Sequence, residues 1–177
     1  EKTLVKICGI TTIEQAINIA ELGVDAIGII SVKESPRYIN QLEKKRIFET
    51  LANSFPKIKR VSVVKNISYE DLFKDLSTNN TNVVQLHGDE SIEYCKKLKE
   101  ELPNIDLWKA FRIQTKNDLQ RINYYENFID AILLDSWNQE TYGGTGQRID
   151  SQNLVNINFT KPWWLAGGVS SEWMDQI

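Results

Sequence analysis

Reactive or flexible residues stand where several apolar segments of this chain end. They comprise a thiol, a guanidinium, an imidazole, a carboxylate and two glycine-rich turns: Cys8, Arg37, His87, Asp135, Gly143-Gly144-Thr145-Gly146 and Gly167-Gly168. Asp135 closes a long apolar segment, where a carboxylate is costly to bury unless it is paired or takes part in chemistry. Glycines before a helix let backbone N–H groups approach a phosphate, so we expect Gly167 and Gly168 to bind one rather than only to form a turn.

The other candidate residues also have a plain structural interpretation. Cys8 can be a buried small apolar residue, because free cysteine is among the most buried residue types. His87, which is followed by a glycine, can orient a loop, and Arg37 can form a surface salt bridge. Cys95 continues the apolar stripe of a predicted helix, so we expect it in the core.

Short apolar segments rich in β-branched residues predict the strands that position these groups. There are seven of them: residues 4–8, 26–30, 60–64, 82–86, 106–111, 129–134 and 163–166. Apolar residues at helical spacing predict helices between them, marked by Ile13 to Ala20, Leu42 to Leu51, Leu72 to Leu76, Ile92 to Leu102, and Leu119 to Ile122.

Capping residues and charge runs add detail to these helices. We expect N-caps in the Thr11-Thr12 pair, at Ser68, and at Asp89 or Ser91. Two charge runs, Lys44-Lys45-Arg46 and residues 96–101, are predicted to lie on solvated outer faces.

Strands and helices alternate, which predicts an α/β fold with a parallel sheet, either doubly wound or closed as a (βα)8 barrel. The predicted strand ends recur about every 26 residues, and this regular spacing favours the TIM barrel. An eighth strand at that spacing would lie beyond Ile177. We therefore expect the eighth βα unit to be missing from this chain and the native polypeptide to continue. In such a barrel the candidate residues meet at the C-terminal ends of the strands, where active sites lie.

Composition excludes several classes of function. The 177 residues fit one barrel domain, 1–177, apparently truncated at its C-terminus. A net charge of −3 is opposite to the basic character of nucleic-acid-binding proteins, so we expect no nucleic-acid partner. No apolar run is long enough to cross a membrane and no signal peptide is evident, which favours a cytoplasmic protein with no membrane partner. Two distant cysteines and one histidine lack zinc-ligand spacing, so no metal site is expected.

Six motifs stand at the predicted strand ends, in order along essentially the whole chain. They are Val5-Lys6-Ile7-Cys8-Gly9-Ile10-Thr11, Ser35-Pro36-Arg37-Tyr38, Val84-Gln85-Leu86-His87-Gly88, Leu133-Leu134-Asp135, Gly143-Gly144-Thr145-Gly146 and Leu165-Ala166-Gly167-Gly168-Val169. Each alone is a weak signal. Together they resemble the phosphoribosylanthranilate isomerase family of tryptophan biosynthesis.

The resemblance implies an aldose–ketose isomerase that performs an Amadori rearrangement without a cofactor. Its small-molecule substrate, N-(5-phosphoribosyl)anthranilate, becomes 1-(2-carboxyphenylamino)-1-deoxyribulose 5-phosphate. By similarity, Asp135 is the general acid that protonates the furanose ring oxygen, and Cys8 is the general base that removes the proton from ribose C2. We expect Lys6 to point to the opposite strand face, so no cation is assigned to the Cys8 thiolate.

The resemblance also implies roles for the other motif residues. Arg37 pairs with the anthranilate carboxylate, and His87 supports the site from behind the groups that touch substrate. The glycines of the loop, Gly143, Gly144 and Gly146, are similar to a substrate-covering segment. Gly167 and Gly168 are similar to the first half of a phosphate cradle. Ser62 is a departure, because the family often has glycine there. A monomer or a homodimer is expected.

Two other interpretations are left. Another sugar-phosphate barrel enzyme, such as an epimerase, lyase or synthase, would share the fold and the phosphate cradle, because fold alone does not decide function. A non-catalytic barrel module would be expected to lack the acid, the base or the glycine loops. The presence of Cys8, Asp135 and the glycines favours the isomerase over both.

Overall fold

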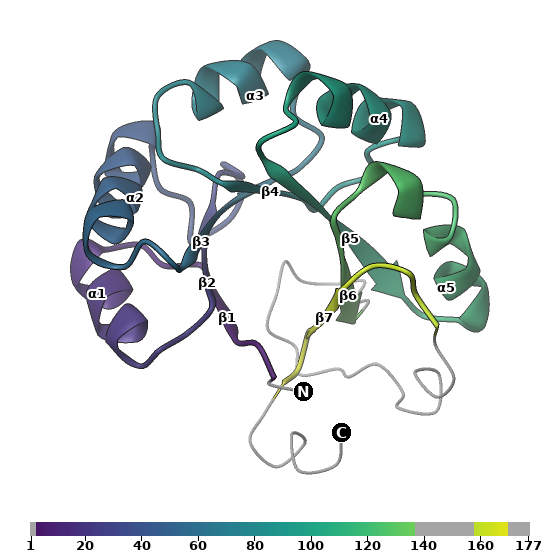
Figure 1. The fold of residues 1–177 in the computed structure, drawn as a ribbon, viewed down its shortest axis with the longest axis horizontal. Helices are drawn as coiled ribbons and strands as arrows, with labels where there is room; N and C mark the ends of the chain where they lie inside the picture. The colour runs from purple at the N-terminus through teal and green to yellow at the C-terminus, as the bar shows by residue number, and fades with distance from the viewer. Residues whose placement is uncertain (1–2, 137–157, 170–177) are drawn as a thin grey trace. The chain divides into compact units, whose positions relative to one another are not determined.

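A computed structural model of the chain describes residues 3–136 and 158–169 (Figure 1). These residues form two compact units. The first comprises residues 3–90 and 103–106, and the second comprises residues 91–102, 107–136 and 158–169. No helix in these ranges is long and apolar enough to cross a membrane.

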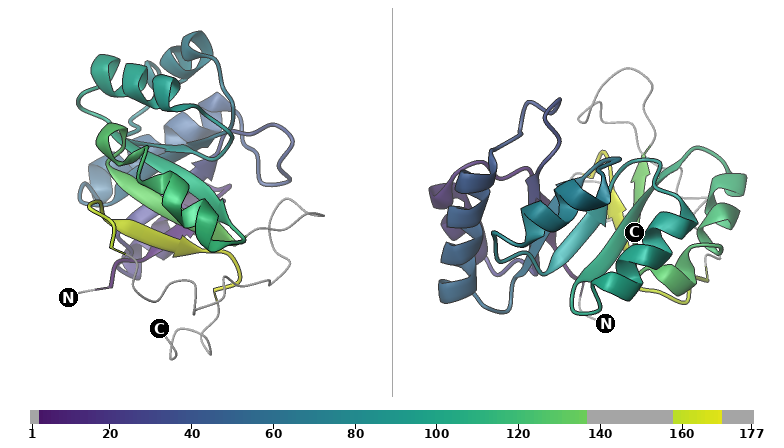
Figure 2. Two further views of the ribbon diagram at one scale, coloured as in Figure 1. Left: turned by 90° about the vertical axis from the view of Figure 1, so that its right-hand side faces the viewer. Right: turned by 90° about the horizontal axis from the view of Figure 1, so that it is seen from above.

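The first unit is a parallel sheet with helices on one face. Its elements are β1 (Lys6–Cys8), α1 (Ile13–Glu21), β2 (Ala26–Ile30), α2 (Gln41–Ser54), β3 (Lys59–Val64), α3 (Tyr69–Leu76) and β4 (Val83–Leu86). The strands pair in the order of the sequence, β1-β2-β3-β4. Helices α1 and α2 lie on the same side of β1, β2 and β3 (Figures 1 and 2).

The strand order and the side on which the helices lie distinguish between the two folds that alternating strands and helices predict, the doubly wound sheet and the barrel. Right-handed crossovers between strands paired in sequence order put every connecting helix on the same face of the sheet. A doubly wound sheet instead reverses its strand order and carries helices on both faces. The first unit therefore has the winding of a barrel.

The second unit repeats the arrangement. Its elements are α4 (Ile92–Glu101), β5 (Asp106–Ile113, whose first residue belongs to the first unit), α5 (Lys116–Ile122), the short 3-10 helix η1 (Glu126–Phe128), β6 (Ala131–Ser136) and β7 (Trp163–Ala166). Strand β6 pairs in parallel with β5 on one side and with β7 on the other.

All seven predicted strands are present among the described residues, and none of their ends is displaced by more than two residues. The five predicted helices are also confirmed. The predicted N-caps are confirmed at Thr12, Ser68 and Ser91, whose side chains accept hydrogen bonds from backbone N–H groups in the first turn. Asn40 caps α2 in the same way, although it was not predicted.

The core of the first unit lies between β2 and helices α1 and α2. Ile27 and Ile29 of β2 alternate with residues of the opposite face, and both pack against α1 and α2. On α2 the buried stripe is Ile47, Phe48 and Leu51. Leu42, expected on that stripe, is instead 58% exposed. In the second unit Cys95 is fully buried, which confirms its predicted place in the core.

Lys44 contradicts the prediction that its charge run is solvated. Its side chain is 1% exposed, and Nζ lies 2.6 Å and 2.5 Å from the carboxylate oxygens of Asp75 on α3. It also donates to the hydroxyl groups of Ser31 and Ser62, so Ser62 belongs to this network. Burial lowers the pKa of Lys44 below its usual value, and the Asp75 carboxylate opposes this shift only in part.

Candidate active site

Cys8 is the last residue of β1, and its thiol lies against a glycine of the neighbouring strand. Cys8 pairs in register with Gly28 on β2. A Cβ atom built on Gly28 would lie 2.8 Å from Cys8 Sγ, closer than real Cβ contacts. The Gly28 carbonyl oxygen accepts hydrogen bonds from Gly9 N (2.9 Å) and Ile10 N (3.3 Å), which hold the turn after β1. Gly28 therefore both leaves room for the thiol and holds the turn that follows it.

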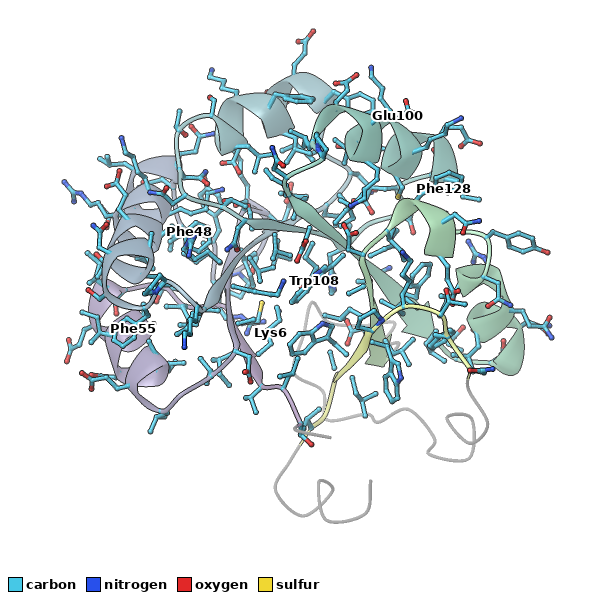
Figure 3. The ribbon with its side chains drawn as sticks, in the orientation of Figure 1. Lys6, Phe48, Phe55, Glu100, Trp108 and Phe128 are labelled. Atoms are coloured by element: carbon cyan, nitrogen blue, oxygen red, sulfur yellow. The ribbon has the colours of Figure 1, made fainter. Side chains whose placement is uncertain are left out.

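Lys6 lies on the same face of β1 as Cys8, which corrects the expectation that it points to the opposite face. Side chains two residues apart on a strand share a face, because successive side chains alternate. The Lys6 Nζ lies 3.2 Å from the position that a Gly28 Cβ would take, beside the Cys8 thiol. Figure 3 shows Lys6 on the side of β1 that faces away from α1.

Arg37 comes close to the same turn from the loop after β2. Its Nη1 makes a long hydrogen bond of 3.5 Å to the Cys8 carbonyl oxygen. Its side chain crosses Gly9, where a Cβ would lie 2.8 Å from both Cδ and Nη1. Gly9 also has a φ of +87°, which other residues adopt only with strain. Arg37 is itself exposed, so its guanidinium is accessible next to the residue that carries the thiol.

His87 follows β4 and contacts a residue that the sequence analysis did not single out. Its Nδ1 lies 2.9 Å from Gln85 Nε2, and Gln85 is buried on the same strand face as His87. The i, i+2 spacing of the two polar side chains was the available sequence signal. The bonded Gln85 amide fixes the orientation of the imidazole ring.

The loops that follow β3 and β4 are tied together by a second unpredicted residue, Glu90. Its buried carboxylate accepts from Asn66 N (2.8 Å) and from Gly88 N (3.0 Å). The Asn66 side-chain oxygen in turn accepts from Asp89 N at 2.8 Å. These bonds fix the segment immediately after His87. No sequence motif pointed to Glu90.

Asp135 lies near the C-terminal end of β6 in the second unit and is half-buried. It pairs in register with Arg112 on β5 and with Ala166 on β7. Leu133, two residues earlier, shares its face and pairs with Trp164, which stacks on Trp108 with ring centroids 4.9 Å apart. The carboxyl group thus stands above an apolar, aromatic layer.

The glycine pair after β7 has the backbone geometry that only glycine adopts easily. Gly167 and Gly168 have φ values of +85° and +64°. Such a turn exposes backbone N–H groups, as a phosphate-binding turn requires. Gly143, Gly144 and Gly146 lie outside the described residues.

The part of the chain that the structure describes contains no set of side chains suited to binding a metal ion. No three histidine, cysteine, aspartate or glutamate side chains gather there in a way that would hold a metal ion. The first unit offers a thiol beside a lysine, with an arginine over the turn that follows, and the second offers a carboxyl group and a glycine turn. These groups are suited to proton transfer and to anion binding.

Known proteins match the chain over almost its whole length. It matches the family model of N-(5'-phosphoribosyl)anthranilate (PRA) isomerase over residues 5–177. The N-(5'-phosphoribosyl)anthranilate isomerase of Trichodesmium erythraeum is 42% identical over 169 residues, which cover 95% of this chain and 72% of that protein.

Solved structures agree. The phosphoribosylanthranilate isomerase of Thermotoga maritima is similar with a TM-score of 0.83 and 34% identity, covering 97% of this chain and 80% of that one. A PRA isomerase in complex with reduced 1-(o-carboxyphenylamino)-1-deoxyribulose 5-phosphate is similar with a TM-score of 0.79 and 31% identity, covering 99% and 80%.

These matches confirm the predicted TIM-barrel type of α/β fold and decide between the three functions that the sequence left. A different sugar-phosphate barrel enzyme and a non-catalytic module are both excluded by the family assignment. The chain belongs to the PRA isomerase family, the enzymes that isomerise N-(5'-phosphoribosyl)anthranilate in tryptophan biosynthesis.

Proposed function

We propose that this PRA isomerase uses Cys8 as its general base and Asp135 as its general acid. Asp135 gives its proton to the furanose ring oxygen, and the bond between that oxygen and C1 breaks. The nitrogen lone pair then forms a C=N bond, which leaves a protonated Schiff base. The Cys8 thiolate next removes the proton from C2, and the electron pair of that C–H bond forms the C=C bond of an enolamine. Tautomerisation of the enolamine gives the ketone product.

The observation that carries the assignment of the base is the position of the Cys8 thiol. It lies at the C-terminal end of a parallel strand, where active sites of this fold lie, and a glycine on the neighbouring strand makes room for it. Cys8 is half-buried, whereas the other cysteine, Cys95, is fully buried in the core. This difference in burial supports Cys8, rather than Cys95, as the base.

The position of Asp135 supports its role as the acid. It lies at the corresponding end of β6, half-buried above the layer formed by Trp108 and Trp164. A carboxyl group at this position is the kind of side chain that donates a proton to a reacting oxygen.

We further propose that Arg37 pairs with the anthranilate carboxylate and that the turn at Gly167 and Gly168 binds the substrate phosphate. Arg37 is exposed and lies over Gly9, next to Cys8, so it is accessible to an anionic ring substituent near the base. A planar guanidinium donates two parallel hydrogen bonds to a carboxylate. Three earlier expectations stay predictions. They are that His87 supports the groups that touch the substrate, that the protein is cytoplasmic, and that it is a monomer or a homodimer.

The test removes each proton-transfer group and uses the buried cysteine as its control. Cys8→Ala and Asp135→Asn are each expected to lower kcat by about 10²–10⁴-fold, with the fold retained by circular dichroism. Cys95→Ala is expected to keep wild-type kcat, because its thiol is buried away from the strand end. Turnover is followed by the loss of anthranilate-type fluorescence. A Cys8→Ala or Asp135→Asn enzyme that keeps more than about a tenth of wild-type kcat would remove that residue from the mechanism.

A further inference from the structure

The side chains of Lys6 and Cys8 both reach the space that a side chain at Gly28 would fill. The Cys8 Sγ lies 2.8 Å and the Lys6 Nζ lies 3.2 Å from the position that a Gly28 Cβ would occupy. The two atoms can be no further apart than the sum of these distances. Gly28 has no side chain, so no side chain of Gly28 separates the sulfur from the ammonium.

The ammonium group of Lys6 has no other counter-charge in the described part of the chain. Within those residues it makes no hydrogen bond and no ion pair, although its side chain is only half-exposed. A half-buried cation that loses part of its hydration needs a compensating negative charge. The Cys8 thiol, no more than 6.0 Å from the ammonium nitrogen, is a group able to carry one.

The rest of this sheet face supplies no carboxylate. Apart from Lys6, Cys8, Lys59 and Gln85, register and the strand period place only apolar residues and Gly28 on this face of β1 to β4. Lys59 is at the opposite end of β3 and is paired with Asp106. The Asp25 carboxylate lies at the N-terminal end of β1, where it accepts a hydrogen bond from Val5 N at 2.9 Å. His87 follows β4 and is bonded to Gln85, and Arg37 approaches Cys8 through its backbone oxygen.

We propose that Lys6 is a positioning residue for the catalytic base, whose ammonium group stabilises the thiolate form of Cys8. The inference rests on the proposed role of Cys8. When the thiolate takes the C2 proton it becomes a neutral thiol, the C–H electron pair moves into the enolamine, and Lys6 keeps its charge. Opposite unit charges about 6 Å apart at an effective dielectric constant of 20 correspond to roughly a hundredfold preference for the charged pair. Partial exposure of Lys6 reduces this to about tenfold.

The experiment measures thiolate reactivity and turnover on the same proteins. A Cys95→Ala background leaves Cys8 as the only cysteine. Lys6→Met keeps the length of the side chain without its charge, and Lys6→Arg keeps the charge. Lys57→Met, at an exposed position before β3, is the matched control. Alkylation of Cys8 by iodoacetamide is followed by mass spectrometry across neutral pH, because the thiolate is the form that reacts.

The expected result is that Lys6→Met slows alkylation at neutral pH by about tenfold or more. Its kcat falls with little change in KM. Lys6→Arg restores most of both rates, and Lys57→Met leaves both at their wild-type values. Wild-type alkylation in Lys6→Met would overturn the proposal, and so would a raised KM with kcat and alkylation unchanged, because that pattern means that Lys6 binds a substrate anion. If Cys8→Ala retains turnover, the proposed base is wrong, yet the alkylation rates still decide whether Lys6 supports the thiolate.

Discussion

Gly28 offers a sharp test of how the thiol is positioned, because a single added methyl group acts on it directly. In Gly28→Ala the new Cβ would lie 2.8 Å from Cys8 Sγ. Non-bonded heavy atoms in proteins usually approach to about 3.5–4.0 Å, so the sulfur must move by roughly 1 Å. The Lys6 ammonium, at 3.2 Å from the new atom, must also give way.

The displacement sets the size of the effect. A reacting group misplaced by about 1 Å can cost about 10²-fold in rate, so we expect kcat of Gly28→Ala to fall by that order. Stability should change little, because Gly28 has no positive φ and alanine costs a strand less backbone entropy than glycine. The assay combines kcat from the fluorescence of the anthranilate group with the free energy of unfolding in urea.

Gly23 provides a control with the opposite expectation. It has a φ of +81°, but nothing lies within 4 Å of an added Cβ. Gly23→Ala should therefore lower the free energy of unfolding by about 1–2 kcal/mol, the usual cost of a left-handed residue, and leave kcat unchanged. Wild-type kcat in Gly28→Ala would refute the reasoning, since the thiol position would then not depend on the space above that glycine.

Three further predictions address binding, stability and pH. Arg37→Ala should raise KM through the loss of the carboxylate contact, and Arg37→Lys should restore it only in part, because an ammonium lacks the two-pronged donor; steady-state kinetics measure both. Lys44→Met should lower the free energy of unfolding by about 3–5 kcal/mol because it leaves the Asp75 carboxylate buried without its partner, whereas Lys44→Met with Asp75→Leu should recover most of the loss in urea denaturation. Burial raises the pKa of Asp118, but hydrogen bonds from Thr115 and Gln114 outweigh it and hold that pKa below 3.8. The free energy of folding that the Asp118 carboxylate contributes is present above pH 3.8 and is lost as the pH falls through the pKa of Asp118 in the folded state. Asp118→Asn should therefore flatten the acid side of a plot of the free energy of unfolding against pH.

The sequence predicted the elements of this fold well because hydrophobic spacing is set locally. A buried parallel strand such as Ala26–Ile30 is a continuous apolar run, and its length and β-branched residues separate it from the amphipathic stripe of α1. The strand pairs form between distant segments, yet the regular spacing of the segments was enough to predict a barrel. Least predictable were the ends, since β1 begins two residues later than the apolar run does.

Contacts between side chains of different elements were less predictable. Gln85 and Glu90 matter through hydrogen bonds to His87 and to the loop after β3, and no spacing rule predicts which loop a carboxylate will reach. Gly28 is similar: the sequence shows a glycine within a strand, which signals a close approach by another group. It does not show that the approaching groups are the Cys8 thiol and the Lys6 ammonium.

Two lysines were placed wrongly for the same reason, and the comparison between them bears on function. Lys44 was assigned by residue type to a solvated face, although it stands three, four and seven residues before Ile47, Phe48 and Leu51, on the buried stripe of its helix. Lys6 was assigned to the wrong face, although it stands two residues before Cys8. In both cases the period of the helix or strand decides which way the side chain points. The charge decides only that the side chain needs an oppositely charged or polar partner in that place. The Lys44 ammonium group is paired with the Asp75 carboxylate and also donates to two serine hydroxyls, so its partners lie within the fold. Lys6 makes no hydrogen bond or ion pair among the described residues, and its ammonium group lies beside the Cys8 thiol. Folded proteins keep incompletely compensated charge mainly at sites that use it, and this contrast is why Lys44 belongs to the stability of the chain and Lys6 to its chemistry.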